Sequence, residues 1–128
     1  MQPSLQSFML VACGGALGSI ARYGVAVLAL KLPVQLPIGT LTANLVGCFL
    51  IGLFSQLALN SSSLPPGARL FLIAGFCGGF TTFSTFALEI ITLIDTAQPL
   101  QALIYAISSV VLGLLALLLG VWVVKVVL

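Results

Sequence analysis

Four long apolar runs dominate the chain, and short stretches rich in turn-forming residues separate them. The runs cover residues 5 to 30, 38 to 59, 70 to 94 and 99 to 127. The stretches between them carry Pro, Gly, Asn, Ser and Asp, which favour turns. Because a helix needs roughly 20 apolar residues to cross the hydrocarbon core of a bilayer, the pattern predicts a single domain, residues 1–128, of four transmembrane helices.

The composition supports a membrane protein. Hydrophobic residues make up 61% of the chain and charged residues 5%, and the mean hydropathy is +1.32. Soluble domains carry about 25% charged residues, so we expect an all-α integral membrane protein surrounded by lipid. We expect the first run to be retained rather than cleaved as a signal peptide, since no basic residue precedes it and it is too long. With two acidic residues and no histidine, an enzyme is not expected, nor is a nucleic-acid partner.

The basic residues give no clear orientation in the membrane. Four helices place both termini and the second connection on one side, toward which Arg69 and Lys125 lie, whereas Arg22 and Lys31 lie toward the other side. Cytoplasmic loops normally carry an excess of Lys and Arg, so this balance favours insertion in both orientations and an antiparallel, dual-topology homodimer. The alternative is that one of these charges, or the N-terminal amine, fixes a single orientation.

The third run contains the unusual segment "GFCGGFTTFSTF", residues 75 to 86. Glycine weakens a helix interior, and non-helical main chain at membrane depth is tolerated only where it lines protein or a water-filled cavity. The segment therefore predicts a broken third helix, unwound at its glycines, whose free main-chain groups hold ions. The alternative is an unbroken helix whose glycines only permit close packing.

A helical wheel at about 100° per residue gives the residues of this segment two faces. Phenyl ring edges carry partial positive charge, so an aromatic face can attract an anion, and hydroxyls on the other face can donate hydrogen bonds. Packing against lipid or core is the alternative for the phenylalanines. The aromatic face holds Phe80, Phe83 and Phe86, and the polar face holds Thr81, Thr85, Glu89 and Thr92 with Ser84 at its margin.

Polar residues in the other runs add candidates. Asn44, with Thr40 one turn earlier on the same face, is either an interhelical hydrogen-bonding group or a donor facing a pore. Arg22 lies about 12 Å inside the end of the first run, by helical rise. It can snorkel to the surface, pair with Glu89, or line a positive vestibule that attracts anions, which we favour. For Tyr105, both a hydroxyl lining the pathway and a packing role stay open.

The three cysteines do not form a recognisable metal or disulfide motif. Cys13, Cys48 and Cys77 each lie within an apolar run, and no CxxC spacing is present. An odd number without such spacing supports neither a disulfide framework nor a zinc site. We interpret them as small apolar packing residues.

Three segments together resemble the CrcB, or Fluc, family of fluoride channels. They are "GGALGSIARY", "GTLTANLVGCFLIG" and "GFCGGFTTFSTF", in this order, and the resemblance covers nearly the whole chain. It implies an antiparallel dual-topology homodimer with two fluoride pores in a bacterial inner membrane. By motif, it implies anion coordination by Phe83 and Phe86, a polar track with Ser84 and Thr85, a pore asparagine at Asn44, Arg22 near the vestibule, and a structural sodium ion at the dimer centre held by the main-chain carbonyls of Gly78 and Thr81. We add Thr40 and Tyr105 to the predicted fluoride pore.

The implied function is passive export of fluoride. Hydrogen fluoride crosses bilayers as a neutral acid and dissociates in the more alkaline cytoplasm, and a pore lets the membrane potential drive the trapped anion out. No Walker motif is present and none is needed. The main alternative is a proton-coupled small multidrug transporter, which requires an acidic residue deep in the first run, but the chain has none before Glu89. A noncatalytic assembly subunit would not require glycines beside a ladder of hydroxyls.

Overall fold

The computed structural model describes residues 4–59 and 64–127, and the ordered elements in these residues are all helices. Four spans are long and apolar enough to cross a membrane, which confirms the predicted number. The first span ends one residue earlier than predicted and the third begins four residues earlier. Residues 60–63 of the second connection lie outside the described residues. The spans are α1 (Leu5–Ala29), α2 (Ile38–Leu59), the third span (Pro66–Asp95) composed of α3 (Pro66–Arg69), η1 (Leu70–Cys77), α4 (Gly78–Phe80) and α5 (Ser84–Asp95), and α6 (Pro99–Val127).

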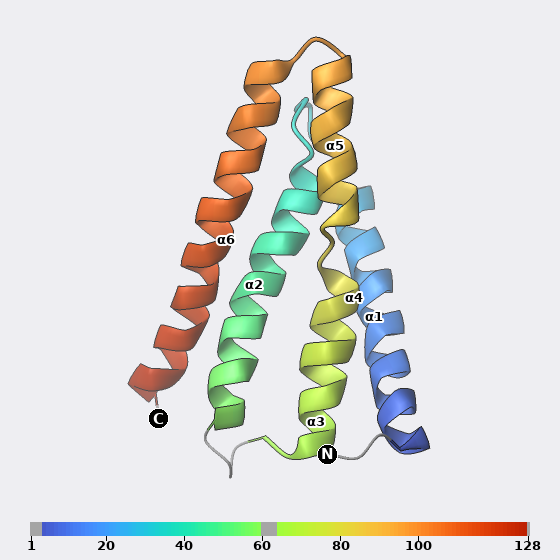
Figure 1. Cartoon of the computed structure of the whole chain (residues 1–128), viewed down its shortest axis with the longest axis vertical. Coiled ribbons are helices and arrows are strands. Elements are labelled where there is room, and N and C mark those ends of the chain that lie inside the picture. Colours follow the sequence, from blue (N-terminus) through green and yellow to red (C-terminus); the bar gives the residue numbers. More distant parts are fainter. Residues whose placement is uncertain (1–3, 60–63, 128) are drawn as a thin grey trace.

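The spans run alternately up and down (Figure 1). The start of α1, the end of α2, the start of α3 and the end of α6 lie at one end of the bundle, whereas the connections from α1 to α2 and from α5 to α6 lie at the opposite end. The main packing partners are α2 with α6, and α1 with η1 and α4. The molecule thus consists of two helix pairs, α2 with α6 and α1 with the first half of the third span. Helix α2 joins the two pairs, because it also contacts α1 and the third span.

Local sequence explains where several helices begin. The Ser4 hydroxyl accepts a hydrogen bond from the Ser7 amide and caps α1. Pro66 opens α3 and Pro99 opens α6, at positions where a missing N–H is harmless. Between α5 and α6 the chain turns at Ala97, which has a positive φ of 59°.

Glycines bring α1 and the third span into main-chain contact. Gly14 and Gly18 are buried. A Cβ on Gly18 would collide with the carbonyl oxygen of Phe76, and a Cβ on Gly79 would collide with the carbonyl oxygen of Gly15. The two backbones can touch because these glycines have no side chain, the usual role of small residues between membrane helices.

The prediction that the third helix unwinds at its glycines is wrong. Gly75, Gly78 and Gly79 all lie within helical segments, and Gly75 and Gly79 pack against α1. The helical path instead ends at Phe80, Thr81 is extended with φ −86° and ψ 159°, and α5 begins at Ser84. The glycines therefore serve close packing, and the interruption follows them.

Most large apolar side chains face outward. Leu103, Leu114, Leu118 and Trp122 on α6 are each more than half exposed, as expected for a surface covered by lipid, where burial between helices brings no hydrophobic gain. A small core cluster of Leu93, Ala102 and Tyr105 joins α5 and α6. This cluster fixes the half of the bundle that carries the candidate site.

Candidate ion pathway

Asn44 on α2 holds the interruption in the third span. Its Oδ1 atom accepts a hydrogen bond from the Thr82 amide at 2.8 Å, and its Nδ2 atom donates to the Thr82 carbonyl at 3.0 Å. Main-chain groups left unpaired at membrane depth cost several kcal/mol each. One side-chain amide thus satisfies both main-chain groups of the residue where the helix is broken.

This arrangement frees a carbonyl at the end of the first half of the span. In a continuous α-helix the Thr82 amide would donate to the Gly78 carbonyl, but it donates to Asn44 instead. One residue earlier the helical bond is intact, since the Thr81 amide donates to the Cys77 carbonyl at 3.0 Å. Gly78 is exposed, and a Cβ there would have no neighbour nearer than 4.0 Å. The Gly78 carbonyl therefore lacks its helical partner on an open face of the molecule.

A sodium ion at this point would bind oxygen atoms such as these. In residues 4–59 and 64–127, no group of three or more His, Cys, Asp or Glu side chains is placed to hold a metal. The predicted sodium ligands, the main-chain carbonyls of Gly78 and Thr81, lie on either side of the point where helical geometry ends. Hard cations prefer oxygen ligands of this kind, so the donor type fits sodium.

Arg22 on α1 approaches the same interruption. Its Nε atom donates to the Gly79 carbonyl at 3.2 Å, and the Ser19 hydroxyl reaches the same oxygen at 3.5 Å. Glu89 accepts its hydrogen bonds from Thr40 and Tyr105, whereas the hydrogen bond of Arg22 goes to the main chain. Arg22 and Glu89 instead line one cavity of about 250 Å³, which agrees with a vestibule position for the arginine.

Glu89 on α5 accepts hydrogen bonds from two of the predicted pore hydroxyls. Thr40 Oγ1 donates to Glu89 Oε1 and Tyr105 OH donates to Glu89 Oε2, each at 2.6 Å. Tyr105 is only 1% exposed, and its ring lies 5.3 Å from that of Phe86 between centroids. The carboxylate therefore ties α2, α5 and α6 together, and the tyrosine combines a packing role with a hydrogen bond to a group that lines a cavity.

Two of the three predicted phenylalanines come together. Phe83 and Phe86 have ring centroids 5.8 Å apart at an angle of 48°, and Phe83 is 79% exposed. Phe80 is 5% exposed and stacks on Phe76. The prediction that Phe80 shares their face is wrong, because the interruption changes the helical phase between residues 80 and 83.

The hydroxyls of the segment gather at the start of α5. Thr82 Oγ1 accepts from the Thr85 amide at 3.2 Å and lies 3.1 Å from Thr85 Oγ1 and 3.4 Å from Ser84 Oγ. A hydroxyl three residues before a helical amide is a common helix-capping arrangement. The predicted track residues Ser84 and Thr85 are therefore grouped with Thr82 beside the interruption.

Three cavities lie in succession in this half of the bundle. The entrance cavity, about 270 Å³, lies against the connection from α1 to α2, and it shares Ala26, Gly39, Thr40 and Glu89 with the vestibule cavity of about 250 Å³. The phenylalanine cavity, about 290 Å³, lies farther along α2. The vestibule cavity is lined by Ser19, Arg22, Tyr23, Ala26, Gly39, Thr40, Thr82, Thr85 and Glu89. The phenylalanine cavity is lined by Asn44, Cys48, Ile51, Thr81, Thr82, Phe83, Phe86, Ser109 and Val110.

Sequence reasoning missed several residues of these cavities, among them Thr82 and Ser109. Thr82 was detectable, since threonine is one of the residues that commonly precede the start of a helix. Ser109 lines the phenylalanine cavity, and its buried Oγ has no hydrogen-bond partner in the described part of the chain. Nothing in the fourth run distinguishes the cavity-lining Ser109 from its neighbour Ser108, whose hydroxyl returns to the Tyr105 carbonyl.

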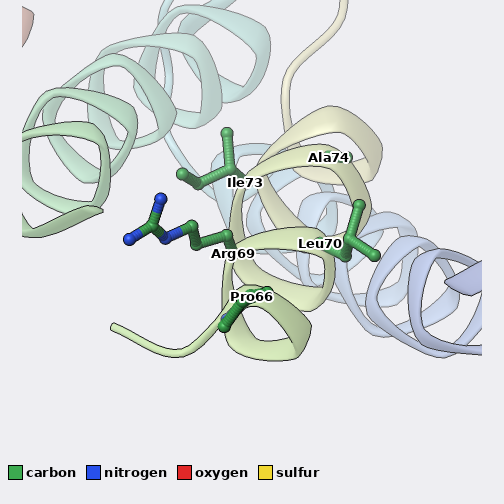
Figure 2. Close-up of a pocket in the computed structure, with 5 residues that line it drawn as sticks. All are labelled: Pro66, Arg69, Leu70, Ile73 and Ala74. Atoms are coloured by element: carbon green, nitrogen blue, oxygen red, sulfur yellow. The ribbon is translucent and has the colours of Figure 1, made fainter. Parts of the chain in front are cut away.

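A larger cavity lies elsewhere and does not contain the predicted site residues. It measures about 610 Å³ and lies at the start of the third span. Figure 2 shows that Arg69 extends from the helix on the side away from Leu70. The lining is Pro66, Arg69, Leu70, Ile73 and Ala74, which is apolar apart from the arginine and offers few groups to an ion.

Comparison with known proteins identifies the family. The sequence model of the family described as "CrcB-like protein, Camphor Resistance (CrcB)" matches residues 9–121. The chain belongs to the CrcB family. This confirms the resemblance found in the three sequence segments.

Curated relatives of this CrcB-family chain are named "Fluoride-specific ion channel FluC". The protein from Chlorobium phaeobacteroides is 42% identical over 126 residues, which cover 98% of each chain. The protein from Nitrobacter winogradskyi is 48% identical over 118 residues, covering 91% of this chain and 94% of the relative. Ion channels are not enzymes, so the CrcB-family chain is no enzyme. The four apolar spans and the relationship to these channels together identify a multi-pass protein of the plasma membrane.

Proposed function

We propose that this CrcB-family chain is a fluoride-selective ion channel that exports cytoplasmic fluoride passively. The observation that carries the proposal is the pair of hydrogen bonds from the Asn44 side chain to the main chain of Thr82, which we call the Asn44–Thr82 clamp. The clamp stabilises the interruption of the third span beside Phe83 and Phe86. The curated relatives, named as fluoride-specific channels, support the choice of ion.

The phenylalanine cavity has the chemistry needed to replace the hydration shell of a small anion. Asn44 Nδ2 carries two hydrogens, and one is donated to the Thr82 carbonyl, so the second serves the ion. The edges of Phe83 and Phe86 supply partial positive charge. Of the further predicted pore hydroxyls, Thr40 and Thr85 line the neighbouring vestibule cavity, and Ser84 lies beside Thr82. The hydroxyls of Thr40 and Tyr105 donate to Glu89. A narrow passage of such groups disfavours the larger chloride ion.

Arg22 gives the vestibule cavity a fixed positive charge. Its Nε atom donates to the Gly79 carbonyl. Because Arg22 also lines the vestibule cavity, the other donors of the guanidinium group are available to attract an anion there. The arginine therefore raises the local concentration of fluoride without forming a permanent ion pair with it.

The functional unit is an antiparallel homodimer with two pores. Phe83 is 79% exposed in a single chain, and a second copy would cover it and complete the pathway. Related by two-fold symmetry, the copies would form two equivalent pores. The Gly78 and Thr81 carbonyls of both copies would hold a structural sodium ion at the centre, where the Gly78 carbonyl lacks its helical partner.

Purified protein in liposomes is expected to release fluoride rapidly and to release little chloride. Phe83→Ile removes a ring edge from the ion path, and losing about 1.4 kcal/mol of stabilisation slows passage tenfold, so we expect at least that loss of flux. Ion-selective electrodes measure both halides. Phe8→Ile, the same change at a phenylalanine that is 67% exposed on α1, is the control and should conduct normally. Equal passage of fluoride and chloride would refute selectivity.

Dual topology predicts that either end of the molecule is found on both sides of the membrane. In a chain with its native cysteines replaced, Val34→Cys, in the connection from α1 to α2, should be labelled from outside the cell by an impermeant thiol reagent in about half of the molecules, because equal insertion in both orientations is proposed. Val127→Cys, at the other end of the molecule, should give the same fraction, and neither change alters the basic residues that set orientation. Complete labelling of one variant and none of the other would show a single orientation.

No contact of an acidic side chain favours the alternative of a proton-coupled small multidrug transporter among the residues that the structure describes. Helix α1 contains no acidic residue, and the Glu89 carboxylate accepts hydrogen bonds from Thr40 and Tyr105. A cationic drug would need a carboxylate free to exchange a proton. We therefore retain the channel as the proposed function.

A further inference from the structure

The vestibule cavity and the phenylalanine cavity meet at one residue. Of the residues that the structure describes, Thr82 is the one that lines both. The entrance cavity joins the vestibule cavity through shared residues that include Thr40 and Glu89. An ion that travels from the entrance to Phe83 and Phe86 through these cavities must therefore pass Thr82.

The main chain of Thr82 cannot easily move out of the way. Asn44 binds both its N–H and its C=O, so a displacement of the backbone would break two hydrogen bonds together. The side chain has more freedom, because its hydroxyl rotates to suit its partners. The part of Thr82 that can respond to a passing ion is therefore the hydroxyl.

The present bonds of this hydroxyl are suited to exchange. Thr82 Oγ1 donates to Thr85 Oγ1 at 3.1 Å, and the Ser84 hydroxyl lies at 3.4 Å. These are bonds between neutral groups, whereas a bond to an anion is roughly twice as strong. An anion at the boundary between the two cavities can thus attract the hydroxyl proton, while the Thr85 amide still donates to the Thr82 oxygen.

We propose that Thr82 transfers fluoride between the Arg22 vestibule and the Phe83–Phe86 cavity, with its hydroxyl as the donor and Asn44 as the residue that fixes its position. This inference rests on the proposed fluoride channel. It adds a residue to the ion path and locates the crossing point in the gap between α4 and α5. The predicted track of Ser84 and Thr85 then becomes the set of hydroxyls that rebind the Thr82 side chain after the ion has passed.

Thr82→Val tests the hydroxyl while preserving the shape of the side chain and both main-chain bonds to Asn44. We expect fluoride efflux from liposomes to fall by about tenfold, because the loss of a hydrogen bond to a charged group is large enough for such a change. Thr82→Ser keeps the hydroxyl and should retain most of the flux. Thr92→Val, the same change at an exposed threonine whose hydroxyl returns to the Leu88 carbonyl, is the matched control.

The outcomes separate this inference from the proposed function. Elution of each detergent-solubilised variant as a single species checks folding. Normal flux in Thr82→Val, with Phe83→Ile still impaired, overturns the role of Thr82 and leaves the channel intact. Equal loss in Thr82→Val and Thr82→Ser also overturns it, because the hydroxyl would then not be the cause. If the unaltered protein passes no fluoride, the channel proposal and this inference fail together.

Discussion

Asn44→Asp is expected to lower fluoride efflux by about a hundredfold. The change removes the Nδ2 donor that binds the Thr82 carbonyl and places a carboxylate oxygen against that carbonyl. Leaving a buried polar group unpaired costs about 1–3 kcal/mol, and a new negative charge beside the path repels the anion. A combined rise of about 2.7 kcal/mol in the barrier corresponds to a hundredfold loss.

Liposome flux measures this effect, and a second position on α2 supplies the control. Gln56→Glu makes the same amide-to-acid change near the other end of the helix, outside the residues that line the phenylalanine cavity, and should conduct within a few-fold of the unaltered protein. Full activity in Asn44→Asp would show that the clamp on Thr82 is dispensable. Equal losses in both variants would show that any carboxylate on α2 impairs the protein.

The four spans were predictable because each depends on local composition. A run of apolar residues long enough to cross lipid is visible without any knowledge of its neighbours, and the structure places helices over all four runs. Boundaries moved where proline starts a helix early, as at Pro66. These features need no long-range information, so the sequence is sufficient for them.

The position of the interruption was not predictable in the same way. Glycine weakens helices locally, which pointed to residues 75–79, yet these glycines are packed against α1. The helix breaks at Thr81–Phe83 because a side chain from α2, distant in sequence, replaces the helical partners of Thr82. Competition between a tertiary hydrogen bond and a helical one cannot be seen from one segment.

The candidate site shows the same division. Phe83 and Phe86 follow each other within one helical turn, so their proximity follows from spacing. Phe80 was misplaced because a single helical wheel was continued across a break. The hydrogen bonds from Thr40 and Tyr105 to Glu89 join three helices. The sequence indicates each of these residues as a candidate, but it does not show that Thr40 and Tyr105 share Glu89 as their partner.

Gly18→Ala is expected to destabilise the protein, whereas Gly24→Ala on the same helix is expected to leave it unchanged or stabilise it. A Cβ on Gly18 collides with the main chain of Phe76 and Phe80, but a Cβ on Gly24 meets nothing within 4 Å. Main-chain atoms cannot turn aside as a flexible side chain can, so the helices must separate, at a cost of about 2 kcal/mol or more. Alanine is otherwise favoured over glycine in a helix by about 1 kcal/mol.

Thermal unfolding of the detergent-solubilised protein should therefore show a lower Tm for Gly18→Ala and an equal or higher Tm for Gly24→Ala. The strained contact lies directly before the interruption, since Phe80 is the last residue of α4. Separation of α1 from α4 would also lengthen the bond from Arg22 to the Gly79 carbonyl, so fluoride flux should fall along with stability. A Gly18→Ala protein with unchanged Tm and unchanged flux would mean that α1 and the third span are not in main-chain contact.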